Sequence, residues 1–175
     1  MRVIEERGPS KRELLAALRA SRDEVVAIVH ALTPERLEEG RYEAGWNGRQ
    51  ILAHLASIEW TYPKLIEIAS EAAAAPTPAG DTCAGEPATR PMREGNDTYN
   101  ARQVAKRDNL SVAELLAEFE RNRAATIEAV EAAAEPLFDV RIRSAGGVTG
   151  TLGAVFYQVA VAHVLGHARD IGGRG

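Results

Sequence analysis

Hydrophobic residues recur at intervals of three and four over most of the chain, and runs of alternating β-branched residues are almost absent. This spacing places apolar side chains on one face of an α-helix. Four long segments have the pattern, and polar stretches or stretches rich in glycine and proline separate them. The pattern therefore predicts an all-α protein, and its natural architecture is a four-helix bundle with short additional helices.

Capping signals mark where the first helices begin. Ser10 is followed three residues later by Glu13, the pattern of a capping box, so we expect the first long helix to begin there. Thr33-Pro34 combines a capping residue with a first-turn proline and predicts a short helix that ends at Gly40.

The second long helix is predicted over residues 48–74. Pro63 lies inside this segment and has no N–H group to donate, so we expect a kink near Glu59 or Trp60. Residues 75–95 are too rich in proline and glycine for a helix and predict a long surface loop. Such a loop can be a lid over a site, but we favour a plain connection.

The second half of the chain repeats these signals. Asn96 or Asp97 can cap a short helix that continues to Lys106, and Ser111 with Glu114 is a second capping box. The capping box at Ser111 is expected to begin the third long helix.

A break over residues 136–150 precedes the last helix. Within it, residues 139–143 are expected to be briefly extended. Thr151 should begin the fourth long helix, which is apolar on nearly every side and ends at Gly172-Gly173. A helix of that composition is normally buried, either centrally or against another subunit.

Composition indicates an ordinary globular protein. The chain has 175 residues, 45% of them hydrophobic and 26% charged, which suits one domain over residues 1–175. The formal charge of −4 gives no reason to expect nucleic acid as a partner. Basic residues do not stand apart from acidic ones, so we do not expect binding to an anionic membrane surface either.

Targeting signals are not evident. No stretch reaches the roughly 18 apolar residues that a membrane span needs, and the acidic N-terminal residues are unlike a signal peptide. Cys83 is the only cysteine, so no internal disulfide can form. We therefore expect a cytoplasmic protein.

Three of the four histidines occupy apolar helix faces. His163 and His167 are one turn apart, about 40° on a helical wheel, so we expect both imidazoles to point into the bundle. His54 lies in the apolar stripe of the second long helix. On the same wheel, the face of His163 and His167 also carries Leu152, Phe156 and Ala160.

This placement is typical of a metal site. Two histidines at positions i and i+4 can chelate one divalent ion, and a third from a facing helix gives the three-ligand arrangement of catalytic zinc sites. Imidazole suits zinc, nickel, copper and iron alike. A lone histidine on an apolar face is usually a core residue bonded to a carbonyl group. Three inward histidines, with only His30 left over, favour the shared metal.

Three segments resemble the DinB-like (DinB/YfiT) superfamily, which includes the N-terminal domain of mycothiol-dependent maleylpyruvate isomerase. The segment Trp46–Leu55, followed by Glu59, resembles the family's W-[ST]-x-[RK]-[DE]-[VIL]-[LV]-x-H-[LI] motif. The segment Tyr157–Ile171 is similar to its terminal H-x-x-x-H helix, and Asn96–Asn100 followed by Ser111–Leu115 is similar to its middle section. The resemblance covers nearly the whole chain.

The resemblance implies a four-helix bundle in which His54, His163 and His167 bind a divalent ion, most often zinc or nickel. It also implies a metal-dependent enzyme that uses a low-molecular-weight thiol such as mycothiol, bacillithiol or glutathione, as an S-transferase or isomerase. Two residues depart from the motif. Asn47 stands where Ser or Thr is usual, and Gln50 replaces an acidic residue. We also expect the isomerases' additional C-terminal domain to be missing, which leaves their specific reaction open.

Two classes of function stay open. An enzyme would bind a thiol, or a water for hydrolysis, at the open metal position, and its substrate would be a small molecule. Asp170 is a candidate for orienting a ligand imidazole, Tyr99 and Asn100 are candidates for the pocket wall, and Glu59 points away from His54 on the wheel.

The alternative is a non-catalytic metal-binding protein that sequesters a small molecule or acts through a partner in a stress response. A fourth protein ligand would favour that role, and Cys83 is the only thiol available. Trp60 and the all-round apolar last helix suggest a subunit interface, and so a homodimer.

Overall fold

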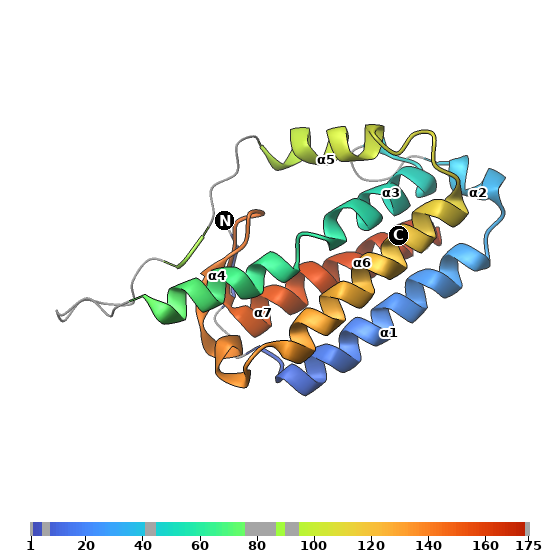
Figure 1. The fold of residues 1–175 in the computed structure, drawn as a ribbon. Coiled ribbons are helices and arrows are strands. Elements are labelled where there is room, and N and C mark those ends of the chain that lie inside the picture. Colours follow the sequence, from blue (N-terminus) through green and yellow to red (C-terminus); the bar gives the residue numbers. More distant parts are fainter. Residues whose placement is uncertain (1, 5–7, 41–44, 76–86, 90–94, 174–175) are drawn as a thin grey trace.

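Four long helical segments form the body of the molecule (Figure 1). The computed structural model describes residues 2–4, 8–40, 45–75, 87–89 and 95–173. The four segments are α1 (Lys11–His30), α3 (Gly48–Glu59) with α4 (Pro63–Ala74), α6 (Val112–Ala132), and α7 (Leu152–Tyr157) continued by η3 (Gln158–Ala162) and α8 (His163–Ile171). Helices α1 and α3 each pack against both α6 and α8, so α1 and α3 lie across the bundle from each other. The predicted four-helix bundle is confirmed.

Capping boxes begin the helices where the sequence predicted them. The Ser10 side chain accepts a hydrogen bond from the backbone of Glu13, whose carboxylate accepts one from the Ser10 backbone in return. Ser111 and Glu114 form the same pair at the start of α6. These bonds satisfy backbone N–H groups that the first turn of a helix leaves unpaired.

Two short helices complete the helical part. Helix α2 (Pro34–Glu38) follows α1 and is capped by Thr33, close to the predicted bounds. Helix α5 (Asn96–Ala105) packs across α3 on the outside of the bundle (Figure 1).

The second long helix is interrupted rather than kinked. Helix α3 ends at Glu59 and α4 begins at Pro63. Between them, the Thr61 and Tyr62 N–H groups each donate to a carbonyl three residues earlier, in a tight turn. Proline fits the first position of a helix because its missing N–H is unpaired there in any case. The sequence therefore predicted the position of the interruption correctly, but the single predicted helix is in fact two helices, α3 and α4.

A small sheet lies at one end of the bundle. Strand β3 (Val148–Thr151) pairs in parallel with β1 (Arg2–Val3) and antiparallel with β2 (Arg141–Arg143), which follows the 3₁₀ helix η2 (Glu135–Asp139). The predicted extended stretch is confirmed in β2, whereas β1 and β3 were not expected. Residues 144–147 form the turn between β2 and β3, with Gly147 at a φ of 79°. Strand β3 runs directly into α7, which Thr151 caps.

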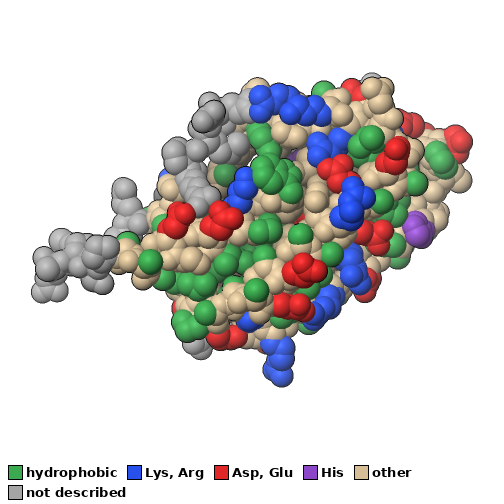
Figure 2. Space-filling model, in the orientation of Figure 1, with side chains coloured by type: hydrophobic (Ala, Val, Ile, Leu, Met, Phe, Trp, Pro, Cys, Tyr) green, Lys and Arg blue, Asp and Glu red, His purple; other side chains and the backbone are tan. Residues whose placement is uncertain are grey.

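Most of the predicted loop over 75–95 lies outside the described residues, and so does Cys83. Within it, Ala88 forms an isolated bridge with Ile142 of β2. In the described parts of the chain, no helix combines the length and the apolar character needed to cross a membrane. Acidic and basic side chains are interspersed over the face of the molecule shown in Figure 2.

Candidate metal centre

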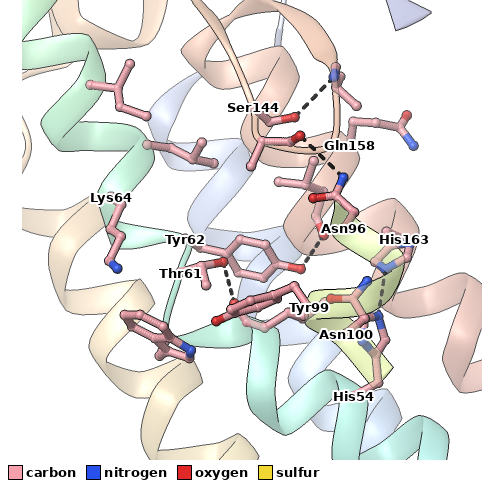
Figure 3. A pocket seen from close by; sticks show the side chains of 18 residues that line it. His54, Thr61, Tyr62, Lys64, Asn96, Tyr99, Asn100, Ser144, Gln158 and His163 are labelled. Atoms are coloured by element: carbon pink, nitrogen blue, oxygen red, sulfur yellow. Dashed lines mark hydrogen bonds between the residues drawn. The ribbon is translucent and has the colours of Figure 1, made fainter. Parts of the chain in front are cut away.

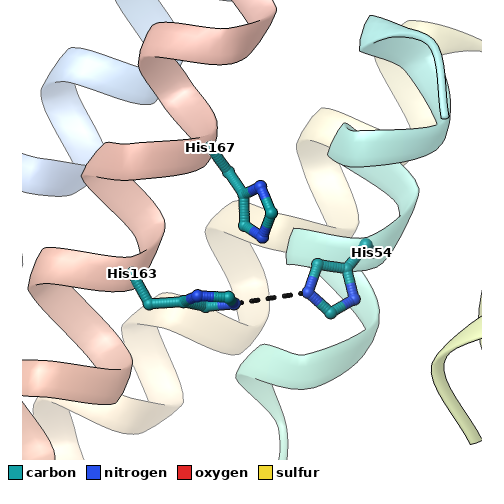
Figure 4. A group of neighbouring side chains, drawn as sticks. All are labelled: His54, His163 and His167. Carbon is teal, nitrogen blue, oxygen red and sulfur yellow. Dashed lines mark hydrogen bonds between the residues drawn. The ribbon is translucent and has the colours of Figure 1, made fainter. Parts of the chain in front are cut away.

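The three histidines singled out in the sequence meet between α3 and α8 (Figure 4). One nitrogen atom from each of His54, His163 and His167 lies within 4.8 Å of the other two. The His163 and His167 rings are 4.4 Å apart between centroids, and the His54 ring is 5.1 Å from that of His167. Because α3 and α8 pack directly together, the bundle itself brings the three side chains to one point.

The spacing of two of these nitrogens suits a metal ion. The Nε2 atoms of His54 and His163 face each other at 3.4 Å. A tetrahedral ion with bonds of about 2.0–2.1 Å to nitrogen separates two of its ligand atoms by roughly 3.4 Å. The cluster can therefore hold a divalent ion with little movement of His54 or His163.

The three side chains differ in exposure. His54 and His167 are buried, with 3% and 4% of their surface exposed, whereas His163 is exposed. His163 lines a cavity, and its accessible surface opens onto that space. As expected, the His163 ring points into the bundle toward His54 and His167, and it also forms part of the cavity wall.

The surroundings of two of these rings favour the uncharged imidazole. Burial lowers the pKa of His54 to about 3, with further contributions from the nearby His167 and His163. The pKa of His163 is lowered to about 4, first because protein atoms surround most of the ring even though part of the residue is exposed, and second because of His167. Protein atoms around a ring weaken the hydration of its charged form, and a neighbouring imidazolium repels a second one. Both rings are thus held in the form that binds metals.

The residues before His54 fix the start of its helix. Asn47 caps α3 by accepting from the Gln50 N–H at 2.9 Å, and the Gln50 side chain accepts from the Asn47 N–H at 3.1 Å. The two departures from the family motif therefore form a complete capping box. Trp46 packs on the His54 ring, with centroids 5.1 Å apart, and Arg49 donates to the Leu110 carbonyl ahead of α6.

Asp170 lies beside His167 rather than His163. Its Oδ2 is 3.6 Å from the His167 Nδ1, which is too long for a hydrogen bond. A carboxylate at this position is the usual partner of a metal-binding imidazole, because it fixes which nitrogen carries the proton. The structure places Asp170 next to His167, and its orienting role stays a prediction.

A cavity of about 580 Å³ adjoins the cluster. Its wall includes His54 and His163 at one end, and Figure 3 shows Lys64 on the opposite side. Tyr99 and Asn100, the two candidates for a pocket, both line it. The other described residues of its wall are Ile58, Trp60, Thr61, Tyr62, Leu65, Ile68, Asn96, Ser144, Ala145, Gly146, Val148, Gln158 and Val159.

Trp60 also has a place in this wall. The Lys64 Nζ lies 3.7 Å from the centre of the Trp60 ring, a cation–π contact, and 43% of the Trp60 side chain is exposed. The all-round apolar last helix is covered by α1 and α3 of the same chain. Both features therefore have an explanation within one chain, and the homodimer stays a prediction.

Sequence reasoning missed the buried Arg123 and gave Glu59 no role. Glu59 is fully buried and faces Arg123 of α6, which is also fully buried, with Nε and Oε1 2.8 Å apart. Burial raises the pKa of Glu59, although the Arg123 charge opposes that shift. A sequence signal for Arg123 did exist, because Arg123 falls four residues from both Phe119 and Ile127 in the apolar stripe of its helix.

The fold matches solved structures. A mycothiol-dependent maleylpyruvate isomerase is similar over 94% of this chain, with a TM-score of 0.70 and 17% sequence identity. YfiT from Bacillus subtilis, described as a probable metal-dependent hydrolase with an unusual four-helix bundle topology, matches over 92% of this chain and 83% of its own, with a TM-score of 0.64 and 17% identity. An uncharacterised protein from Escherichia coli UTI89 has a TM-score of 0.59 at 16% identity, over 92% of this chain and 91% of its own.

The share of each solved structure that this chain matches limits the conclusions that can be drawn from the similarity. The chain spans 61% of the length of the isomerase. A comparison with curated proteins finds no match. The model of the DinB superfamily, in contrast, matches residues 17–171, a range that contains all three histidines and most of the bundle. The chain therefore belongs to the DinB superfamily.

Proposed function

We propose that this protein is a divalent-metal-dependent enzyme in which His54, His163 and His167 hold the ion, zinc or nickel, and a small molecule reacts in the adjoining cavity. The observation that supports this most directly is the position of the cluster at the cavity wall. His54 and His163 line a space of about 580 Å³, within the usual size of small-molecule sites.

An open position on the metal is part of this proposal. Among the described residues, the cluster consists of three histidines and contains no cysteine or carboxylate. Three protein ligands are typical of catalytic sites, whereas structural zinc sites are closed by four. When bound, the ion would lower the pKa of a thiol or water held beside it.

The chain's own residues would supply the rest of the site. His54 and His163 are held unprotonated, so they are ready to coordinate. Ile58, Leu65 and Ile68 give the cavity apolar surface, which excludes water and suits a largely apolar substrate. The side-chain amides of Asn100 and Gln158 can orient polar groups of that substrate.

We propose a low-molecular-weight thiol such as mycothiol, bacillithiol or glutathione as the co-substrate of an S-transferase or isomerase. The name of the mycothiol-dependent structural relative supports this choice. The description of YfiT as a probable metal-dependent hydrolase supports water in the same position instead. Both candidates share the metal centre, and thiol binding separates them.

The first experiment measures the metal content of protein purified without a histidine tag, by elemental analysis. Near-stoichiometric zinc or nickel is expected in the parent, and its loss in a His163→Ala, His167→Ala variant that remains folded. The His30→Ala variant is the matched control, because His30 ends α1 and is not in the cluster. A parent that neither contains nor takes up metal would exclude the metal centre.

The second experiment is titration calorimetry of the metal-loaded protein with each of the three thiols. Binding of one thiol that requires the metal supports the transferase or isomerase. Metal-dependent hydrolysis of ester or amide probes without any thiol binding would favour the hydrolase. A loaded protein that binds small molecules but turns none over would indicate a sequestering role.

A further inference from the structure

The helix that carries two of the three histidines departs from α-helical geometry just before them. Residues Gln158–Ala162 form a π-helical turn, in which the His163 N–H donates to the Gln158 carbonyl five residues earlier. Helices α7 and α8 flank this turn without a break in the chain. Single π-turns are rare inside α-helices and are frequent at functional sites.

The π-turn determines the direction of the histidines. It adds about one residue to a turn, so every later side chain is rotated by roughly 100° relative to an uninterrupted α-helix. His163 and His167 both follow the turn and rotate together. Their spacing to each other would survive without the turn, but they would no longer face His54.

Side chains from the α3–α4 turn and from α6 bind carbonyl groups of this π-turn. The Tyr62 hydroxyl donates to the Val159 carbonyl at 2.7 Å, and Figure 3 shows the Tyr62 ring in the cavity wall. The Arg123 Nη2 donates to the Ala160 carbonyl at 2.9 Å. Both groups are buried, so these hydrogen bonds form where water does not compete strongly.

Arg123 also links the turn to the helix of His54. Its guanidinium pairs with the Glu59 carboxylate, with Nη2 and Oε2 2.9 Å apart, and Glu59 lies five residues after His54 at the end of α3. On its other side, Arg123 donates to the Leu18 carbonyl and the Ser21 hydroxyl of α1. A planar group with five donors thus joins α1, α3, α6 and the π-turn.

We propose that Tyr62 and the Arg123–Glu59 pair are positioning residues that hold the π-turn, and through it aim His163 and His167 at His54. The inference rests on the proposed function only in that the aimed histidines are taken to bind a metal. The orientation itself is a property of the metal-free chain and can be measured there.

The test uses Tyr62→Phe, which removes the hydroxyl and keeps the ring in the core. The matched control is Tyr157→Phe, which removes a hydroxyl from an exposed tyrosine one residue before the turn. A second variant, Arg123→Met with Glu59→Leu, removes both buried charges together, so that neither is left unpaired. Circular dichroism establishes that each variant is folded.

Two measurements follow on the folded proteins. The first is Co²⁺ binding to the metal-free chain, with the visible absorption of the bound ion as a measure of its ligand geometry. We expect Tyr62→Phe and the double variant to weaken binding about 10- to 100-fold and to alter the spectrum, as loss of a group that orients metal ligands does. Tyr157→Phe should match the parent in both respects.

The second measurement is the NMR spectrum of the histidine rings without metal. The ring signals of His163 and His167 should move in Tyr62→Phe and stay in place in Tyr157→Phe. Unchanged ring signals and an unchanged Co²⁺ spectrum in Tyr62→Phe would overturn the proposal, even if that variant were less stable. If the parent binds no Co²⁺, the metal centre is excluded, while the ring signals still decide whether Tyr62 positions the histidines.

Discussion

At the scale of single residues, the protonation of the histidines couples the cluster to folding. The pKa of His54 is lowered to about 3 and that of His163 to about 4, from an ordinary value of 6.5. The unfolded chain therefore takes up protons at a higher pH than the folded chain does. The two histidines' contribution to stability is fully present above about pH 6.5 and is lost as the pH falls through about 4 for His163 and about 3 for His54.

We predict that the metal-free protein loses stability as the pH falls below 6.5, and that His54→Gln loses less. The variant removes the group with the most strongly lowered pKa, so one of the protons that favours unfolding disappears. Urea unfolding between about pH 7.5 and 4.5 measures the slopes. Equal slopes in the parent and His54→Gln would contradict the prediction.

The sequence identified the histidines because each lies on an apolar helix face, where a polar side chain is conspicuous. The same reasoning applies to Arg123, which falls between Phe119 and Ile127 in an apolar stripe. Its partner Glu59 lies 64 residues earlier in the chain. A helical wheel describes one helix at a time, so it could not show that these two buried charges face each other.

At the scale of helices and strands, the Arg123–Glu59 pair connects α6 to the end of α3. Both side chains have 0% exposed surface, so neither charge is stabilised by water. A buried ion pair contributes little net stability compared with apolar residues of similar size, but one partner without the other is very unfavourable.

We predict that Arg123→Ala destabilises the protein by about 3–5 kcal/mol, because it leaves the Glu59 carboxylate buried without its partner. The double variant Arg123→Met, Glu59→Leu should be close to the parent in stability. Urea unfolding at neutral pH measures both. A double variant as unstable as Arg123→Ala would show that the bridging hydrogen bonds, rather than the charge balance, stabilise the bundle.

Helices were predictable to the extent that their signals are local. The capping boxes at Ser10 and Ser111 lie within four residues of sequence, and both helices begin there. In contrast, β1 forms by pairing with β3, where Arg2 is opposite Val148. These residues are far apart in sequence, so no local pattern predicts the pairing. The π-turn was missed for a related reason. The wheel assumes one constant rotation per residue, and Tyr62 and Arg123 bind the turn from distant parts of the sequence.

At the scale of the whole molecule, the cavity is assembled from segments far apart in sequence. Residues of α3, α4, α5, the β2–β3 turn and the last helix all contribute to it. Apart from the histidines, Lys64 is the only charged side chain among its described lining residues. Its position across the cavity from the histidines favours a ligand with an anionic group at that end (Figure 3).

We predict that Lys64→Gln weakens binding of the aromatic sulfonate 1-anilinonaphthalene-8-sulfonate about 3- to 10-fold, on the scale of one partly exposed charge interaction. Binding of the uncharged N-phenyl-1-naphthylamine should change little. Fluorescence titration measures both probes, and Lys106→Gln at the end of α5 is the control. An equal effect on the two probes would mean that Lys64 shapes the cavity rather than attracting an anion.

The turn between β2 and β3 lies outside the four-helix core, yet Ser144, Ala145 and Gly146 form part of the cavity wall. The helices hold the histidines, and this turn shapes the space in front of them. Substitutions or insertions at the turn can therefore change which molecule fits the cavity without moving the ring nitrogens of the three histidines. The solved structures with 16–17% identity share the fold, which is the part of the molecule that the four helices determine.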